Sequence, residues 1–144
     1  MKPVFVDSDP ETFNMDWDLV SDAVSSNTVA IISTSIFGQP TDGSGLRKFM
    51  ASHPDVPIIQ DCAHSFFAGQ VHLVGKAAFY GLNISKIITS VFGGMVSTDD
   101  ERFASELLRI REEFFQTPGF FKELKRSIYF FSIYLYLCFN YSNR

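Results

Sequence analysis

Hydrophobic and polar positions along the chain follow two alternating patterns. Short apolar runs rich in β-branched residues predict strands, and apolar residues at helical spacing predict helices. Strands are expected at residues 4–6, 29–35, 56–61, 77–82 and 94–98. Helices are expected at residues 15–24, 46–53 and 99–115. Asn14 is the expected N-cap of the first helix, because its side chain can accept a free backbone N–H.

This order of elements predicts an α/β fold with a mainly parallel sheet, since strands alternate with helices. Residues 29–35 form a continuous β-rich run, and both this run and residues 56–61 are expected to be buried strands of a parallel sheet. Ligands of such sheets bind beyond the carboxyl ends of the strands. Asp7, Ser35, Asp61 and the loop that carries Lys86 all lie at or just after the ends of predicted strands. We therefore expect these groups on one rim of the sheet.

The last third of the chain has a different composition. Residues 128–139 are almost entirely apolar or aromatic, and Lys122, Lys125 and Arg126 come just before them. Twelve residues are too few to cross a bilayer, which takes about 20. We predict an aromatic helical tail that packs against a partner. Contact of residues 120–141 with a membrane surface is the alternative.

Composition narrows the class of protein further. The chain has 144 residues, of which 46% are hydrophobic, so it can form a core. The net charge of −4, without a basic run before the last third, argues against nucleic-acid binding. Cys62 and Cys138 form neither a disulfide framework nor a metal-binding pattern, which favours a reducing cytoplasm. The first ten residues lack the apolar core of a signal peptide.

The N-terminal stretch V-F-V-D-S-D-P-E-T offers one candidate chemistry. It resembles the strand end of haloacid dehalogenase phosphatases, which implies Asp7 as nucleophile, Asp9 as acid and base, and a bound Mg²⁺. Glu11 stands where that motif has Thr or Val. The favoured interpretation is an acidic turn that leads into the next helix.

Two further candidates follow from residue chemistry. Asp61 could pair with a protonated ring nitrogen and His64 could lie beside that ring; a capping Asp and a structural His are the alternative. Lys86 could attack a carbonyl if an apolar setting favours its neutral amine. Its neighbours Ile84, Ile87, Ile88 and Val91 would supply that setting. An isolated lysine is otherwise a solvated loop residue.

Taken in order, the segments indicate a family. F-V-D-S-D-P-E-T-F-N is followed by F-G-Q-P-T-D, P-I-I-Q-D-C-A-H and N-I-S-K-I-I-T-S-V-F-G-G-M-V-S-T-D-D. This set resembles the DegT/DnrJ/EryC1/StrS aminotransferases, which are fold-type I enzymes dependent on pyridoxal 5'-phosphate (PLP) and act on nucleotide-linked keto-sugars. The resemblance implies a partial fold-type I PLP-transferase large domain with flanking helices, followed by the aromatic helical tail.

The resemblance assigns roles residue by residue. Lys86 matches the lysine that holds PLP and moves a proton between cofactor and substrate. Asp61 matches the aspartate that keeps the pyridine nitrogen protonated, and His64 matches a Gln/His position beside the ring. A dehydratase branch has His in place of the lysine, so Lys86 favours transamination. The implied partners are a nucleotide-sugar substrate, glutamate as amino donor and a second subunit in a homodimer. No metal is implied.

The sequence also departs from the family pattern. Gly81 stands where a phosphate-binding serine is usual, with Ser85 and Asn83 as nearby polar groups, and Lys76 stands where Asp is common. The match covers the centre of the family's large domain. We therefore expect a fragment without the N- and C-terminal parts: residues 1–116 as partial large domain, and 117–144 as a tail leading toward an absent small domain. A non-catalytic remnant or association module is the alternative function.

Overall fold

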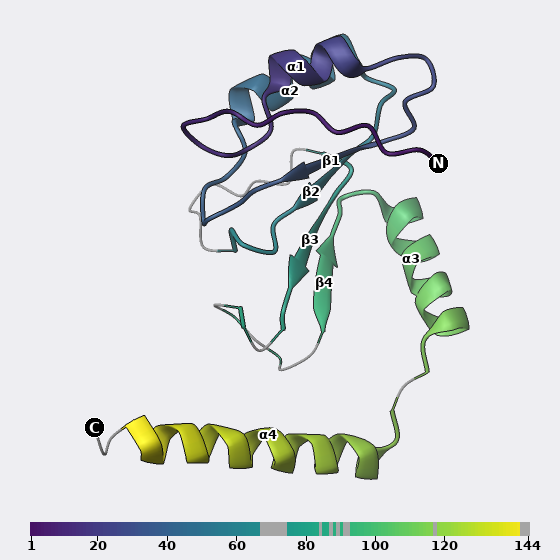
Figure 1. Ribbon diagram of the computed structural model, residues 1–144. Coiled ribbons are helices and arrows are strands. Elements are labelled where there is room, and N and C mark those ends of the chain that lie inside the picture. The colour runs from purple at the N-terminus through teal and green to yellow at the C-terminus, as the bar shows by residue number, and fades with distance from the viewer. Residues whose placement is uncertain are drawn as a thin grey trace. The chain divides into compact units, whose positions relative to one another are not determined.

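The computed structural model describes residues 1–66, 75–83, 85–86, 88, 90, 93–116 and 118–141 (Figure 1). The chain divides into two compact units, residues 1–104 and 105–144. We describe each by itself. The sequence-based boundary at residue 116 remains a prediction.

The first unit is built on a four-stranded sheet in the order β1-β2-β3-β4 (Figure 1). Its strands are β1 (Ile31–Thr34), β2 (Ile58–Asp61), β3 (Ala77–Gly81) and β4 (Gly94–Ser97). β1, β2 and β3 are parallel, and β4 is antiparallel to β3. The expected mainly parallel sheet is thus confirmed.

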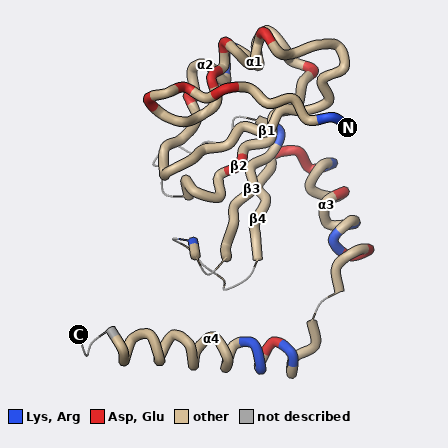
Figure 2. The backbone as a smooth tube through the Cα atoms, in the orientation of Figure 1, with Lys and Arg blue, Asp and Glu red and all other residues tan. Residues whose placement is uncertain are grey.

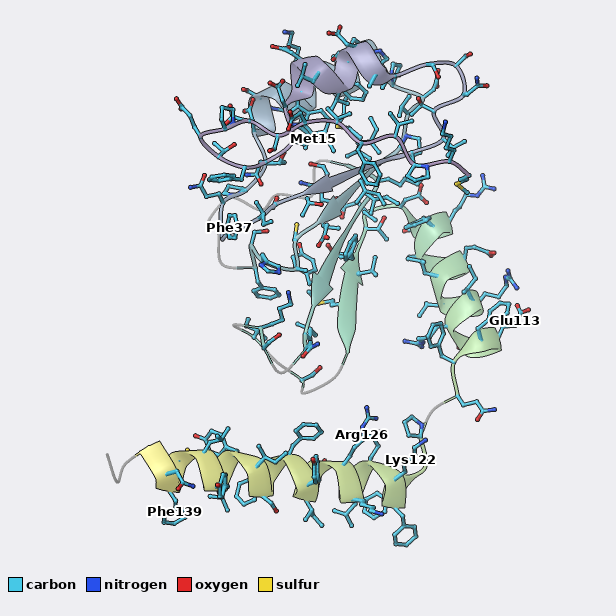
Figure 3. All side chains as sticks on the ribbon, viewed as in Figure 1. Met15, Phe37, Glu113, Lys122, Arg126 and Phe139 are labelled. Atoms are coloured by element: carbon cyan, nitrogen blue, oxygen red, sulfur yellow. The ribbon has the colours of Figure 1, made fainter. Side chains whose placement is uncertain are left out.

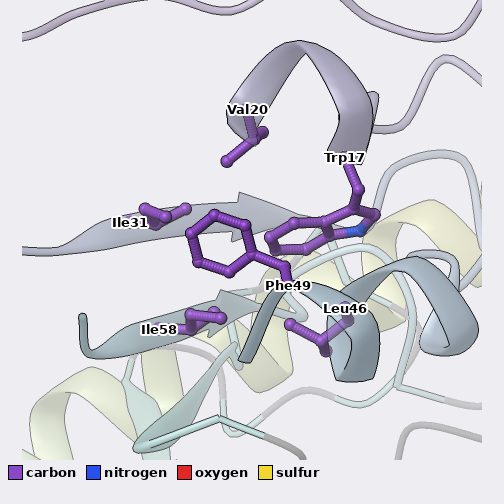
Figure 4. Packing of buried hydrophobic residues seen from close by; sticks show 6 residues of the cluster. All are labelled: Trp17, Val20, Ile31, Leu46, Phe49 and Ile58. Carbon is purple, nitrogen blue, oxygen red and sulfur yellow. The ribbon is translucent and has the colours of Figure 1, made fainter. Parts of the chain in front are cut away.

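Two helices form the core with the sheet. α1 (Trp17–Ala23) and α2 (Gly43–Ser52) pack on each other and on β1 and β2. The buried cluster holds Trp17, Val20, Ile31, Leu46, Phe49 and Ile58 (Figure 4). The rings of Trp17 and Phe49 lie 5.4 Å apart, within the range of favourable aromatic contacts.

Only one face of β1 is buried, contrary to the expectation of a buried strand. Ile31 and Ser33 are buried, whereas Ile32 is 58% exposed. Successive side chains of a strand point to opposite faces. The helices whose residues form the core lie on the face of Ile31, and no described residue buries Ile32.

The predicted strand at residues 4–6 is wrong. Val4 and Phe5 are exposed, and the isolated bridge between Ser8 and Met15 lies after the predicted strand. A strand needs a partner for its backbone hydrogen bonds, and apolar residues alone do not provide one.

The expected N-cap of α1 is also wrong. Asp16 caps this helix, and its side chain accepts the backbone N–H groups of Asp18 and Leu19. In the same way Asp42 caps α2 through the N–H groups of Ser44 and Gly45. A carboxylate suits these positions because it also interacts favourably with the helix dipole.

α3 (Glu101–Phe114) crosses the boundary between the units, and α4 (Phe120–Tyr141) makes up most of the second one. On α3, Arg109 forms ion pairs with Glu106 and Glu113, one turn away on either side. On α4, the charged residues gather in the first two turns (Figure 2). Among the described helices, none combines the length and hydropathy that a bilayer crossing requires.

Candidate functional site

The carboxyl ends of the three parallel strands form one rim of the sheet. Thr34 lies opposite Asp61 on the neighbouring strand, and Asp61 lies opposite Phe79. Beyond the strands, the Ser35 N–H donates to the Asp61 carbonyl at 2.8 Å and the Cys62 N–H to the Phe79 carbonyl at 2.9 Å. The first bond ties the segment after β1 to the end of β2, and the second ties the segment after β2 to β3.

Asp61 ends β2 at this rim. Its side chain is half-buried, and Oδ1 accepts the N–H of Ala63 at 3.0 Å. This bond tightens the turn that presents His64, which is exposed. The loop after β1 comes near the same turn, because a Cβ built on Gly38 would lie 4.0 Å from the His64 carbonyl oxygen.

Lys86 lies in the connection from β3 to β4. Its N–H donates to the Asn83 carbonyl at 2.9 Å, and the Ser85 N–H donates to Asn83 Oδ1 at 3.3 Å. The Leu82 N–H donates to the Gly93 carbonyl at 3.0 Å and closes the base of the loop. Lys86 is half-buried, whereas Asn83 and Ser85 are exposed. This turn therefore fixes the backbone from which the lysine projects.

The side chain of Lys86 folds back over the end of β3. A Cβ built on Gly81 would lie 3.3 Å from Lys86 Cε and 3.4 Å from the Cβ of Ala63. The lysine chain and the turn that follows Asp61 thus meet above Gly81. Within the described residues, no carboxylate lies at ion-pair distance from the Lys86 amine. Of its expected apolar neighbours, Ile84, Ile87 and Val91 lie outside the described residues.

The structure therefore brings Asp61, Ala63 and Lys86 to one place through Gly81, and His64 lies on the same turn. The sequence shows Gly81 in place of the usual serine, but it does not show that the Lys86 side chain lies against this glycine. A small residue five positions before Lys86 was the available signal. The side chain of Lys76, the other departure, forms an ion pair with Asp100.

Asn14 is a residue whose role the sequence did not reveal. Its side chain is 3% exposed, and Nδ2 donates to the carbonyls of Gln39 at 3.2 Å and Pro40 at 3.0 Å. Its Oδ1 accepts the N–H of Ile36 at 2.9 Å. Asn14 thus braces residues 36–40, the loop that follows β1 at the rim.

Cys62 lies buried beside Asp61 and does not present a reactive thiolate. Its side chain is 0% exposed, and burial raises the pKa of the thiol. A protonated, buried thiol acts as a small apolar packing group. We assign Cys62 to the packing beneath the rim.

The N-terminal acidic residues form a turn. Oδ1 of Asp9 accepts the N–H groups of Glu11 at 2.9 Å and Thr12 at 2.7 Å, and also the Thr12 hydroxyl. Hydrogen bonds from Thr12 lower the pKa of Asp9. The favoured interpretation of an acidic turn is confirmed. The strand end required by the phosphatase motif is not formed, and the described residues offer no cluster of three metal-binding side chains.

The similarity of this chain to known proteins indicates the same family as the sequence motifs. The sequence profile of the DegT/DnrJ/EryC1/StrS aminotransferase family matches residues 1–130. UDP-2-acetamido-2-deoxy-3-oxo-D-glucuronate aminotransferase of Pseudomonas aeruginosa is 33% identical over 120 residues, which are 76% of this chain and 32% of that protein. The chain thus spans about a third of the length of that relative.

Solved structures agree in fold. DesI, determined in the presence of its TDP-sugar product, has a TM-score of 0.68 at 31% identity over 81% of this chain and 31% of its own. The Escherichia coli GDP-4-keto-6-deoxy-D-mannose-3-dehydratase with bound hydrated PLP has a TM-score of 0.66 at 29% identity, over 74% of this chain and 28% of its own. The expected fold, part of a fold-type I PLP-transferase large domain, is confirmed. This chain belongs to the DegT/DnrJ/EryC1/StrS aminotransferase family.

Proposed function

We propose that this chain carries the cofactor-holding centre of a PLP-dependent sugar aminotransferase. The observation that supports this most directly is the placement of the Lys86 side chain against Gly81 and Ala63, beside the turn that begins at Asp61. The chain belongs to an aminotransferase family, and for this reason we interpret Lys86 as the lysine that holds the cofactor. A chain that spans about a third of its relatives provides part of such an enzyme.

The residues at the rim suit PLP by their chemistry. Asp61 is a half-buried carboxylate at a strand end, and it can accept a pyridine N–H and keep that nitrogen protonated. Lys86 has an amine with no ion-pair partner among the described carboxylates, so its nitrogen is available to hold the cofactor and to carry a proton. His64 would lie beside the ring. PLP, when bound, supplies an electron sink.

The phosphate of PLP needs donors that Gly81 cannot supply from a side chain. Ser85 and Asn83 are the proposed donors, since both lie in the loop that presents Lys86. Asn83 already receives the Ser85 N–H through Oδ1, so the Ser85 hydroxyl is the group we expect to reach the phosphate. The Asn83 side chain would then hold the loop in shape.

The proposed substrate is a nucleotide-linked keto-sugar, aminated with glutamate as donor in a homodimer for polysaccharide or glycoside synthesis. The name of the Pseudomonas relative and the TDP-sugar product of DesI support the substrate class. Lys86, in the place where the dehydratase branch has His, supports transamination. Two free cysteines, Cys62 and Cys138, support a cytoplasmic location, where thiols remain reduced.

The experiment is reconstitution of the purified chain with PLP. We expect an absorption band of the bound cofactor, which borohydride makes covalent, and peptide mapping should find the label on Lys86. Lys86→Ala should abolish the band, whereas Lys48→Ala, at an exposed lysine of α2, should keep it. Asp61→Asn should weaken the band without changing the site of labelling. Labelling spread equally over Lys86 and Lys48 would contradict the proposal.

An association module without catalysis is the second candidate. It is favoured by one observation, the exposed apolar side chains of α4. Absence of a PLP band in both the unchanged chain and Lys86→Ala would support it over the enzyme.

A further inference from the structure

α4 exposes large apolar side chains on most of its surface. Phe130 and Ile133 are half-buried, and the exposed fractions of the other large apolar and tyrosine side chains at residues 120–139 run from 39% at Leu135 to 83% at Phe121. No charged residue follows Arg126 over the remaining 15 residues of the helix. Water is a poor environment for such a surface, which indicates an interaction site.

The cations of α4 share one side of the helix. Lys122, Lys125 and Arg126 are spaced by three and four residues, which places them on a single face. Tyr129, three residues after Arg126, and Tyr136, seven residues further on, lie on the same face. A tyrosine joins an apolar ring to a polar hydroxyl, so this face carries polar groups beyond its cations, although Ile133 lies between the two tyrosines.

The opposite face is apolar. Phe120, Leu124, Phe131 and Leu135 follow one another at intervals of four, seven and four residues, and Cys138 extends the row. Figure 3 shows Phe139 on the other side of the helix from Arg126. α4 thus has a cationic first third and an apolar face that runs its whole length.

The charges decide between a protein copy and an anionic surface. Glu123 is the acidic residue of α4, and it already pairs with Arg126 at 3.1 Å. Two copies of α4 side by side in parallel would set cations against cations. In antiparallel order the cations would meet the uncharged half. An anionic lipid surface meets all three cations and also receives the apolar face.

We propose that α4 binds the surface of an anionic lipid bilayer and lies in the plane of the interface. Phe120, Leu124, Phe131 and Leu135 enter the boundary between head groups and acyl chains. Lys122 and Lys125 remain among the lipid phosphates, and Tyr129 and Tyr136 sit at the level of the head groups, where tyrosines are enriched. This inference does not depend on the proposed aminotransferase activity.

The test uses the full chain labelled on Cys138 with an environment-sensitive fluorophore. Cys138 is exposed, whereas Cys62 is buried, so the label is selective. With vesicles of phosphatidylcholine and phosphatidylserine we expect a blue shift and co-sedimentation. Lys122→Gln/Lys125→Gln should weaken binding roughly 30-fold, because each lysine near an anionic surface contributes about fivefold. The matched double variant Lys2→Gln/Lys48→Gln has the same net charge and should bind as the unchanged chain.

Further measurements separate the apolar and the electrostatic contributions to membrane binding. Phe131→Asp should abolish binding while retaining Lys122 and Lys125. Raising the salt from about 0.1 M to about 1 M shortens the Debye length from roughly 10 Å to roughly 3 Å and should weaken the unchanged chain most. Equal binding to pure phosphatidylcholine would overturn the proposal. Self-association that Phe131→Asp removes, without vesicle binding, would overturn it in favour of a second copy.

Discussion

Asn14 gives the sharpest test of how the rim of the sheet is held. Asn14→Ala removes two donated bonds and one accepted bond, all made by a side chain that is 3% exposed. The net contribution of one hydrogen bond to the free energy of unfolding is about 1 kcal/mol, and a buried polar group left without a partner lowers that free energy by about 1–3 kcal/mol. The carbonyls of Gln39 and Pro40 can turn toward water, so we expect a loss of about 2–4 kcal/mol in the free energy of unfolding.

The assay is urea unfolding followed by the fluorescence of Trp17. The chain has one tryptophan, which is buried against Phe49 in the first unit, so this signal reports that unit. Asn27→Ala, at an exposed asparagine, is the matched control and should change the free energy by less than about 0.5 kcal/mol. Asn14→Ala could instead change the free energy of unfolding by less than about 0.5 kcal/mol, with an unchanged dependence of that free energy on urea concentration. In that case the loop would not depend on Asn14, and the reasoning would be refuted.

Three other predictions concern backbone space, pH and thiols. Gly75→Ala would set its Cβ against a backbone carbonyl oxygen of β2, which cannot move aside as a flexible side chain can. Thermal unfolding should show a loss of about 2 kcal/mol or more in the free energy of unfolding. An unchanged melting temperature would contradict this prediction. A side-chain hydrogen bond from Ser44 is the main cause that lowers the pKa of Asp42. Because the folded pKa lies below the unfolded one, this contribution is present above about pH 4 and is lost as the pH falls. Asp42→Ala should therefore cost about 1 kcal/mol at pH 7 and less at pH 3, and an equal cost at both would be evidence against the cap. Iodoacetamide should alkylate Cys138 in the native chain and reach Cys62 only after unfolding; equal rates by mass spectrometry would show that Cys62 is not buried.

Local patterns were enough to place most elements. Four strands and three helices lie at or within a few residues of their expected positions. Helices and strands differ in the spacing at which side chains return to one face, so the spacing of apolar residues indicates the type of element. The same patterns placed Asp61 at a strand end and the Lys86 loop after the next strand. The ordered motifs indicated the family, which the comparisons confirmed.

Features that depend on contacts distant in sequence required the tertiary structure. Residues 4–6 have the composition of a strand, yet no described strand pairs with them, and pairing cannot be read from one segment. Asparagine is a residue type that often caps helices, but the side chain of Asn14 forms its hydrogen bonds with residues more than 20 positions away. The sequence by itself determined that a lysine follows an aspartate along the chain. Only the folded chain set that lysine over Gly81, beside the turn after Asp61, because parallel strands bring their carboxyl ends to one edge.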